Sequence, residues 1–289
     1  MRGRRVVVLG AAGQLGRQLV SAFEAAGAAV IGLGRGEFDL GDPDAPRDLL
    51  ELEPEIVVNS AAWTDVDGCA RDPERAIEIN GAAPGRLAAA SSEVRATFVQ
   101  ISTNEVFDGE SADPYLEDAQ PNPINPYGAS KLAGERAVAS SNASHLIVRT
   151  AWIFGPGGRN FPSKIMTAAL SSRERDEPLR IVADEHGNPT WAPDLARGVV
   201  TAMTLGISGV LHLAGEPPAT RYEWALAILA EVEDLKLRAI SRSDYERPAP
   251  VPARAVLSMD LARSLGIASM YWRPPTDEYS ARLLAAAAL

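Results

Sequence analysis

The stretch VVVLGAAGQLG, residues 6–16, decides the fold. Its first four residues, Val6–Leu9, are apolar and predict a strand, and a segment with helical periodicity follows at Gln14–Ala26. Between them the glycines are spaced three apart, GxxGxxG. A chain that turns sharply and approaches a diphosphate closely needs residues without Cβ, and the helix start supplies free N–H groups. We therefore predict a dinucleotide-binding turn, with a plain strand-to-helix turn as the alternative. Its residues are Gly10, Ala12, Gly13, Gln14, Leu15 and Gly16.

Strand and helix patterns continue to alternate through the first half of the chain. Further strands are predicted at Ala29–Leu33, Ile56–Ser60, Ala96–Ser102 and His145–Thr150, and helices at Ala45–Leu52, Pro73–Ser91 and Tyr127–Ser140. Each strand is almost continuously apolar, as expected when helices cover both faces of a parallel sheet. The pattern predicts an α/β fold with a Rossmann-type doubly wound parallel sheet.

The composition changes at the turn-rich stretch Gly155–Gly158, which marks the start of a second region. That region contains predicted strands at Leu179–Val182 and Gly209–Leu213, predicted helices at Pro193–Leu205 and Tyr222–Glu231, and a Pro-rich loop at Arg247–Pro252. We expect a nucleotide-binding domain in residues 1–154, rejoined by about 192–214. A smaller C-terminal substrate-binding lobe would comprise 155–191 and 215–289.

Composition limits the partners of the chain. Its formal net charge of −10 repels polyphosphate, so nucleic acid is not an expected partner. The single cysteine, Cys69, cannot form an internal disulfide, which fits a reducing compartment. The apolar tail that ends at Leu289 is far shorter than the ~20 residues that span a bilayer. We expect a cytoplasmic protein without a membrane partner.

The sequence Tyr127-Gly-Ala-Ser-Lys131 opens a predicted helix. Positions four apart lie on the same helical face, so a phenol and an ammonium can face one site. The cation would stabilise phenolate and lower the tyrosine pKa from its usual value of about 10, which suits acid–base catalysis. The alternative is a surface helix that carries this spacing by chance.

A hydroxyl group lies at the end of the preceding strand. Thr103 follows the predicted strand Ala96–Ser102, and ligands of doubly wound sheets lie outside the carboxyl ends of the strands. We predict that Thr103 hydrogen-bonds a substrate carbonyl beside Tyr127. Its alternative role is a helix cap.

The end of the second strand bears on the choice of cofactor. An acid there binds the ribose 2′-hydroxyl, whereas Arg accepts a 2′-phosphate. The chain has Arg35 and no acid before Glu37, so we predict NADPH, with NADH as the alternative.

Other chemistries have no support in the sequence. The motifs CxxC, HExxH and GxSxG are absent, and His145, His186 and His212 have no ligand spacing. No metal site is predicted.

With these residues identified, the chain resembles the dTDP-4-dehydrorhamnose reductase family of extended short-chain dehydrogenases/reductases. The resemblance covers nearly the whole chain. Its segments are GAAGQLG at Gly10, FDLGDP at Phe38, VVNSAAWTDVDGCA at Val57, ISTNEVFDG at Ile101, NPYGASKLAGE at Asn125, RTAWIFG at Arg149, NF at Asn160, GNPTWAPDLA at Gly187, GVLHLAG at Gly209 and RPAP at Arg247.

The resemblance implies reduction of the 4-keto group of a dTDP-4-keto-6-deoxysugar, with Tyr127 as proton donor, Lys131 as its partner and Thr103 orienting the carbonyl. It also implies a candidate homodimer. Residues implied to contact cofactor are Asp39, Leu40, Ala61, Ala62 and Thr64, together with Tyr127 and Lys131. Residues implied to contact substrate are Thr103, Asn104, Glu105, Trp152, Asn160 and Arg247.

One pair departs from the family pattern. Where these reductases usually carry Asp-Tyr, this chain has Asn104-Glu105, and related dehydratases carry Asp-Glu. Asn104 cannot donate a carboxylic proton, which disfavours a dehydratase. Glu105 is a candidate base for epimerisation beside the carbonyl, or else a polar contact. The remaining alternatives are an epimerase or dehydratase of the superfamily and a non-catalytic subunit similar to the regulatory subunit of methionine adenosyltransferase.

Overall fold

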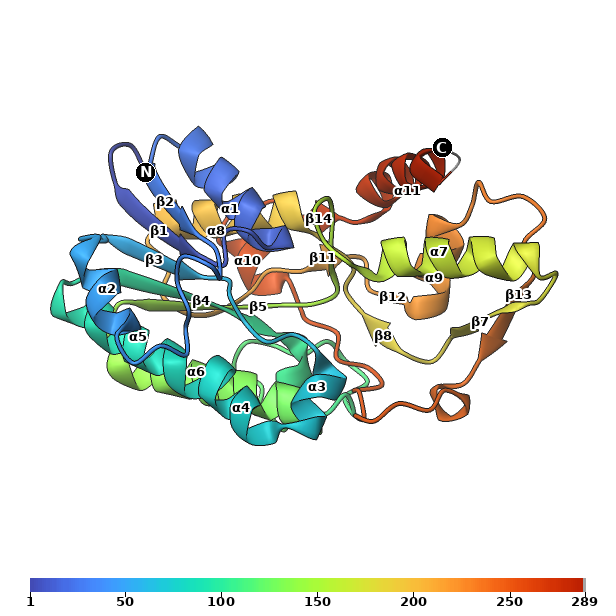
Figure 1. The fold of residues 1–289 in the computed structure, drawn as a ribbon, viewed down its shortest axis with the longest axis horizontal. Coiled ribbons are helices and arrows are strands. Elements are labelled where there is room, and N and C mark those ends of the chain that lie inside the picture. Colours follow the sequence, from blue (N-terminus) through green and yellow to red (C-terminus); the bar gives the residue numbers. More distant parts are fainter. Residues whose placement is uncertain (288–289) are drawn as a thin grey trace.

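The computed structural model describes residues 1–287, and its centre is a six-stranded parallel sheet (Figure 1). The strands lie in the order β10-β5-β4-β3-β1-β2. Their bounds are Arg5–Leu9 (β1), Ala29–Leu33 (β2), Ile56–Asn59 (β3), Thr97–Thr103 (β4), His145–Thr150 (β5) and Gly209–His212 (β10). The predicted α/β doubly wound sheet is confirmed. The chain runs outward in both directions from β1, so the switch point at which such sheets bind ligands lies between β1 and β3.

Helices cover both faces of the sheet. One layer contains α1 (Gln14–Ala25), α8 (Ala192–Thr204) and α10 (Asp260–Ser264), and the other contains α2 (Ala45–Glu51), α5 (Ala83–Glu93) and α6 (Pro126–Ser141) (Figure 1). Successive residues of a strand face opposite sides. Val6 and Val8 accordingly belong to one buried cluster, and Val7 and Leu9 to another. This two-sided burial explains why the strands are continuously apolar.

The second lobe packs around its own aromatic core, which includes the buried Phe154 and Trp224. Its helices are α7 (Phe161–Glu174), α9 (Arg221–Ile228) and α11 (Arg273–Ala287), with the short η3 (Arg242–Asp244). Its strands form two-stranded pairs: β6 (Ile153–Phe154) with β9 (Thr190–Trp191), β7 (Leu179–Val182) with β13 (Leu237–Ile240), β8 (His186–Gly187) with β12 (Ala219–Thr220), and β11 (Gly215–Glu216) with β14 (Met270–Tyr271). Within residues 1–287, no helix combines the length and apolar character that a membrane crossing requires. The predicted apolar tail ends at 288–289, outside the described residues.

The predicted helix Pro73–Ser91 is not a single regular helix. It comprises α4 (Pro73–Ile77), a π-helical turn at Glu78–Ala82 (η1) and then α5. Pro84 lies in the first turn of α5 and has no N–H to donate, so the regular bonding pattern is interrupted just before it. The helices α3 (Val66–Arg71), α7, α10 and α11 were not predicted.

Candidate active site

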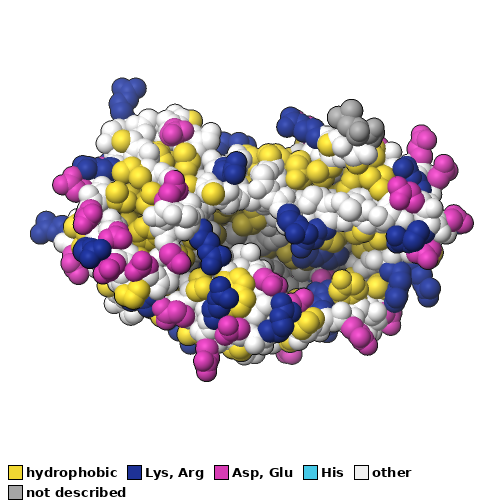
Figure 2. Space-filling model, viewed as in Figure 1, with side chains coloured by type: hydrophobic (Ala, Val, Ile, Leu, Met, Phe, Trp, Pro, Cys, Tyr) yellow, Lys and Arg dark blue, Asp and Glu magenta, His cyan; other side chains and the backbone are white. Residues whose placement is uncertain are grey.

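A cleft of about 800 Å³ opens at the carboxyl ends of the strands, within the size range of small-molecule sites. Figure 2 shows it as a hollow near the middle of the molecule, with Lys and Arg side chains on both of its sides. All the residues predicted to bind cofactor line this cleft: Gly10, Ala12, Gly13, Gln14, Leu15, Gly16, Arg35, Asp39, Leu40, Ala61, Ala62, Thr64, Tyr127 and Lys131.

The lining of the cleft is cationic although the chain is acidic. Among the described residues, five positively charged and two negatively charged side chains line it. The positive ones are Arg35, Arg75, Arg159, Arg221 and Lys131, and the negative ones are Asp39 and Glu105. A concentration of one sign of charge in a low-dielectric cleft attracts ligands of the opposite sign. The cleft therefore favours anionic ligands.

The glycine-rich turn after β1 fits a diphosphate. Gly10 has a φ of +80°, and a Cβ on it would lie 2.8 Å from the backbone nitrogen of Ala61. A Cβ on Gly16 would lie 2.0 Å from the carbonyl oxygen of Gly10. Helix α1 begins after Gly13, which provides no side-chain cap, and its first turn contains no acid. Its N–H groups and positive dipole end thus remain available to an anionic ligand.

The second strand ends in a cation and an acid close together. Arg35 is exposed and lines the cleft. Glu37, the first acid after the second strand, folds back so that its Oε2 accepts a hydrogen bond from the Gly34 N–H at 2.7 Å. Both charges thus lie near the position expected for the adenosine ribose.

The loop after β3 is held by a residue that the sequence did not single out. Asn80, in the π-helical turn, accepts from the Trp63 N–H at 2.8 Å and donates to the Trp63 carbonyl oxygen at 3.0 Å. It also donates to the Ser130 hydroxyl at 3.0 Å. Asn80 therefore ties the segment containing Ala61, Ala62 and Thr64 to helix α6.

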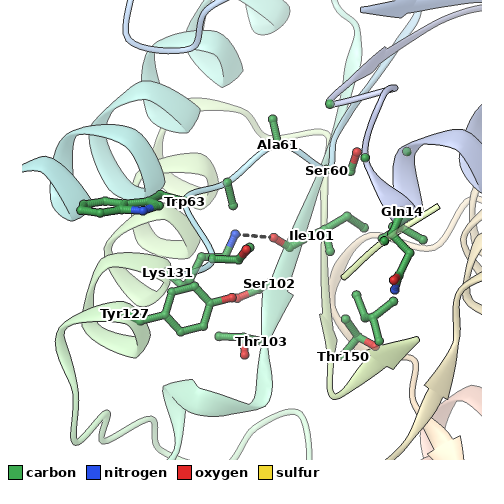
Figure 3. A pocket seen from close by; sticks show the side chains of 18 of the residues that line it. Gln14, Ser60, Ala61, Trp63, Ile101, Ser102, Thr103, Tyr127, Lys131 and Thr150 are labelled. Atoms are coloured by element: carbon green, nitrogen blue, oxygen red, sulfur yellow. Dashed lines mark hydrogen bonds between the residues drawn. The ribbon is translucent and has the colours of Figure 1, made fainter. Parts of the chain in front are cut away.

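Helix α6 presents Tyr127 and Lys131 to the cleft, as predicted from their spacing (Figure 3). Asn125 caps the helix, because its Oδ1 accepts the Gly128 N–H at 2.8 Å. A Cβ on Gly128 would lie 2.0 Å from the carbonyl oxygen of Glu105, so the glycine allows the helix to approach the end of β4. Lys131 is 3% exposed and donates to the Ile101 carbonyl oxygen at 2.7 Å.

The expected lowering of the Tyr127 pKa by Lys131 is wrong for this arrangement. Burial raises the pKa of Tyr127 above its ordinary value, and the charge of Glu105 raises it further, whereas a hydrogen bond with Thr103 opposes them. Burial also lowers the pKa of Lys131 to about 8, although Glu135 opposes this. A phenol that keeps its proton at neutral pH suits a proton donor.

Thr103 serves two purposes at the end of β4. Its Oγ1 accepts the Glu105 N–H at 3.2 Å and so caps the short 3₁₀ helix η2 (Asn104–Val106). The same side chain lines the cleft beside Tyr127 (Figure 3). The cap alternative and the cleft position are therefore compatible.

The unusual Asn104-Glu105 pair has two different surroundings. Asn104 is buried and its amide donates to the Ala255 carbonyl oxygen at 2.9 Å, which makes it a tie to the second lobe. Glu105 lines the cleft and accepts from Asn125 Nδ2 at 2.7 Å. Burial raises the pKa of Glu105, while the bond from Asn125 and the charge of Arg221 oppose the rise.

Trp152 lines the cleft in an unusual backbone conformation, with a φ of +43°. A Cβ on Gly187 would lie 2.5 Å from its ring, so Gly187 is needed for the ring to lie where it does. The guanidinium carbon of Arg221 lies 3.6 Å from the centre of the Trp152 ring. Arg221 was missed by sequence reasoning, because a single arginine before an aromatic residue forms no motif.

Two predicted substrate contacts are engaged within the protein. Asn160 lines the cleft and caps α7, and its amide donates to Gln14 Oε1 at 2.8 Å and to the Gly155 carbonyl oxygen at 2.8 Å. Arg247 does not belong to the cleft lining. Its Nη2 instead pairs with Glu185 Oε1 at 2.8 Å.

A buried ion pair joins helix α6, which carries Tyr127 and Lys131, to the sheet. Arg149 and Glu135 are 4% and 3% exposed, and their closest atoms lie 2.7 Å apart. Glu135 Oε1 also accepts from the Ser102 hydroxyl at 2.5 Å. This network connects β4, β5 and α6 under the site.

Cys69 and His212 are buried and lie outside the catalytic group. Burial raises the pKa of the Cys69 thiol to about 11, which leaves it protonated at neutral pH. Burial and the charge of Arg149 lower the pKa of His212 to about 3, so its imidazole is neutral. Among residues 1–287, no group of three or more His, Cys, Asp or Glu side chains is arranged to hold a metal ion.

The chain is similar to known proteins over almost its whole length. The RmlD substrate binding domain family matches residues 4–284. The dTDP-4-dehydrorhamnose reductase of Burkholderia thailandensis is 38% identical over 289 residues, covering 93% of this chain and 95% of that protein. A crystal structure of a dTDP-4-dehydrorhamnose reductase from Clostridium acetobutylicum has a TM-score of 0.91 at 33% identity, covering 97% of this chain and 99% of that one. The reductase from Bacillus anthracis in complex with NADP has a TM-score of 0.88 at 28% identity, covering 96% and 98%.

Proposed function

This chain belongs to the RmlD substrate binding domain family, which it shares with dTDP-4-dehydrorhamnose reductases, and we propose that it reduces the 4-keto group of a dTDP-4-keto-6-deoxysugar with NADPH. It is an NAD(P)H-dependent oxidoreductase of that family.

One observation carries the proposal. Thr103, Tyr127 and Lys131 come from two different elements, β4 and α6, and line the same cleft as the glycine-rich turn (Figure 3). A proton donor and a carbonyl-orienting hydroxyl thus lie beside a site suited to a dinucleotide diphosphate. This is the arrangement that reduction of a ketone requires.

NADPH, when bound, would supply the hydride that the ketone carbon receives. Tyr127 would donate its proton to the ketone oxygen as negative charge develops there, since its phenol is protonated at neutral pH. The Thr103 hydroxyl would donate a second hydrogen bond to the same oxygen. Lys131, while protonated, adds a positive charge in a buried site, where it stabilises developing negative charge more than it would in water.

The preference for NADPH rests on Arg35 at the end of β2, where a 2′-phosphate would lie. A relative bound to NADP supports the same choice. The dTDP-sugar substrate is supported by the reductases that match almost the whole chain. Because Asn104-Glu105 replaces the pair usual in the family, a deoxysugar other than 4-dehydrorhamnose fits the proposal equally well.

The experiment is NADPH oxidation against a panel of dTDP-4-keto-6-deoxysugars, with product stereochemistry determined by NMR. A reductase consumes one NADPH for each sugar reduced. An epimerase or dehydratase would convert sugar without net loss of NADPH, and a regulatory subunit would show no turnover with any sugar. Either of those two results would refute the proposal.

A further inference from the structure

We propose that Arg221 is the residue that binds the diphosphate of the nucleoside-diphosphate substrate and so selects nucleotide-linked sugars over free sugars. This inference rests on the proposed function for the identity of the substrate.

Arg221 is the first residue of α9 and lines the cleft from the second lobe. Its guanidinium lies on the ring of Trp152, with 3.6 Å from Cζ to the ring centre, and 4.9 Å from the centre of the Phe161 ring. Aromatic rings on a guanidinium face fix its orientation and leave the N–H groups at its edge to bind a ligand. About a quarter of the side chain is exposed, at 24%. The group is thus held firmly while it remains reachable.

The charge of Arg221 is partly balanced by Glu185 and Glu105, which both favour its charged form. Among residues 1–287, Glu185 is its one ion-pair partner, and the Nε–Oε2 distance of 3.8 Å is longer than a hydrogen bond. Glu185 is drawn instead to Arg247, whose Nη2 lies 2.8 Å from Oε1. Burial lowers the pKa of Arg221 to about 10, so the group still carries its charge at neutral pH. A half-buried cation with an incomplete partner set is a site for an anion, and guanidinium groups match phosphate oxygens in pairs.

The anion in question is not the diphosphate of the cofactor. The glycine-rich turn follows β1, whereas Arg221 lies beside Trp152, which follows β5. In the sheet, β3 and β4 separate β1 from β5, and β4 carries Thr103. The catalytic group therefore lies between two anion-binding ends. A ketone held beside Tyr127 would have its own phosphate groups directed toward Arg221.

The experiment measures ligand binding by calorimetry and does not depend on turnover. The ligands are dTDP, thymidine and NADPH, and the variants are Arg221→Met, which keeps a long apolar side chain over Trp152, and Arg221→Lys, which keeps the charge without the planar pair of donors. Arg238→Met is the matched control, because Arg238 is an exposed arginine on β13 of the same lobe. Thermal unfolding of each variant shows whether it is folded.

We expect Arg221→Met to weaken dTDP binding by about 10- to 100-fold, with Arg221→Lys intermediate, because hydrogen bonds to charged groups carry effects of that size. Thymidine and NADPH should bind all variants as they bind the wild type. The inference is overturned when dTDP loses no more affinity than thymidine, when NADPH loses as much as dTDP, or when the wild type does not bind dTDP. Should Arg221→Met fail to fold, Arg221→Lys decides by the same comparison. If the wild type reduces no keto-sugar but Arg221→Met still weakens dTDP binding, only the proposed function is refuted.

Discussion

The ammonium nitrogen of Lys131 lies 2.7 Å from the carbonyl oxygen of Ile101, two residues before Thr103 on β4. This bond joins the helix that presents Tyr127 to the strand that presents Thr103. The positions of the proposed proton donor and the carbonyl-orienting hydroxyl are therefore set by one buried contact between two elements. The pH dependence of the reaction rate should therefore report the protonation state of Lys131.

Because burial lowers the pKa of Lys131 to about 8, we expect kcat/KM for the keto-sugar to fall as the pH rises above about 8. Lys131→Met should reduce kcat/KM by about 10²- to 10⁴-fold and abolish the fall of kcat/KM above about pH 8, the alkaline limb of the pH–rate profile. Unfolding does not explain the limb. Between about pH 8 and 10.5 the unfolded chain binds this proton and the folded chain does not, so Lys131 makes the folded state more stable as the pH rises. A wild-type profile that stays flat to pH 10 would contradict the role of Lys131.

The opposed charges at the end of β2 predict opposite effects on cofactor choice. Arg35→Ala should weaken NADPH binding by about tenfold and leave NADH binding nearly unchanged, because only NADPH carries a 2′-phosphate. Glu37→Gln, which removes the carboxylate held by Gly34, should favour NADPH over NADH. Fluorescence titration of both cofactors measures the two ratios. Equal losses for NADPH and NADH in Arg35→Ala would discredit the assignment of Arg35.

Substitution of Gly187 tests whether the position of the Trp152 ring matters for turnover of the keto-sugar. In Gly187→Ala the new Cβ would meet the Trp152 ring at 2.5 Å, so the ring and the Arg221 that lies on it must shift. A shift of about 1 Å in a positioning group can cost up to about 100-fold in rate, and we expect a loss of that order in kcat/KM for the keto-sugar. NADPH binding, measured in the same samples, should not change. An unchanged kcat/KM would show that Trp152 and Arg221 do not position the substrate.

The buried pair under the site predicts a large effect on stability. Glu135→Gln leaves Arg149 buried without its counter-charge, which should lower the free energy of unfolding by about 3–5 kcal/mol. Glu93→Gln, at an exposed position on the neighbouring helix α5, is the matched control and should change little. Urea unfolding followed by circular dichroism measures both. A loss under about 1 kcal/mol for Glu135→Gln would mean that the network does not support the fold.

The sequence predicted the features that depend on local pattern. Strands β2 and β5 begin and end where expected, since runs of apolar and β-branched residues end at turn residues. Tyr127 and Lys131 share a helical face because their spacing alone determines it. The glycine-rich turn was likewise predicted from its glycines, and two of them, Gly10 and Gly16, have no room for a Cβ.

Features that depend on tertiary packing were not predicted. Arg221 acquires its position from Trp152 and Phe161, which lie more than fifty residues away in the chain. Asn80 gains its role from a π-helical turn that no residue pattern announces. The pKa of Tyr127 is raised by burial and by the charge of Glu105, whereas the spacing to Lys131 suggested that it would be lowered. Each depends on contacts between residues distant in the sequence.

The most direct test follows a labelled hydride. NADPH carrying deuterium at C4 of the nicotinamide, on the face that is transferred, is incubated with the wild type and a dTDP-4-keto-6-deoxysugar, and the product is analysed by NMR and mass spectrometry. The proposed mechanism predicts one deuterium at C4 of the sugar for each NADPH oxidised, and a rate about 10²- to 10⁴-fold lower in Tyr127→Phe with NADPH binding retained. Product without deuterium, or an undiminished rate in Tyr127→Phe, would contradict it.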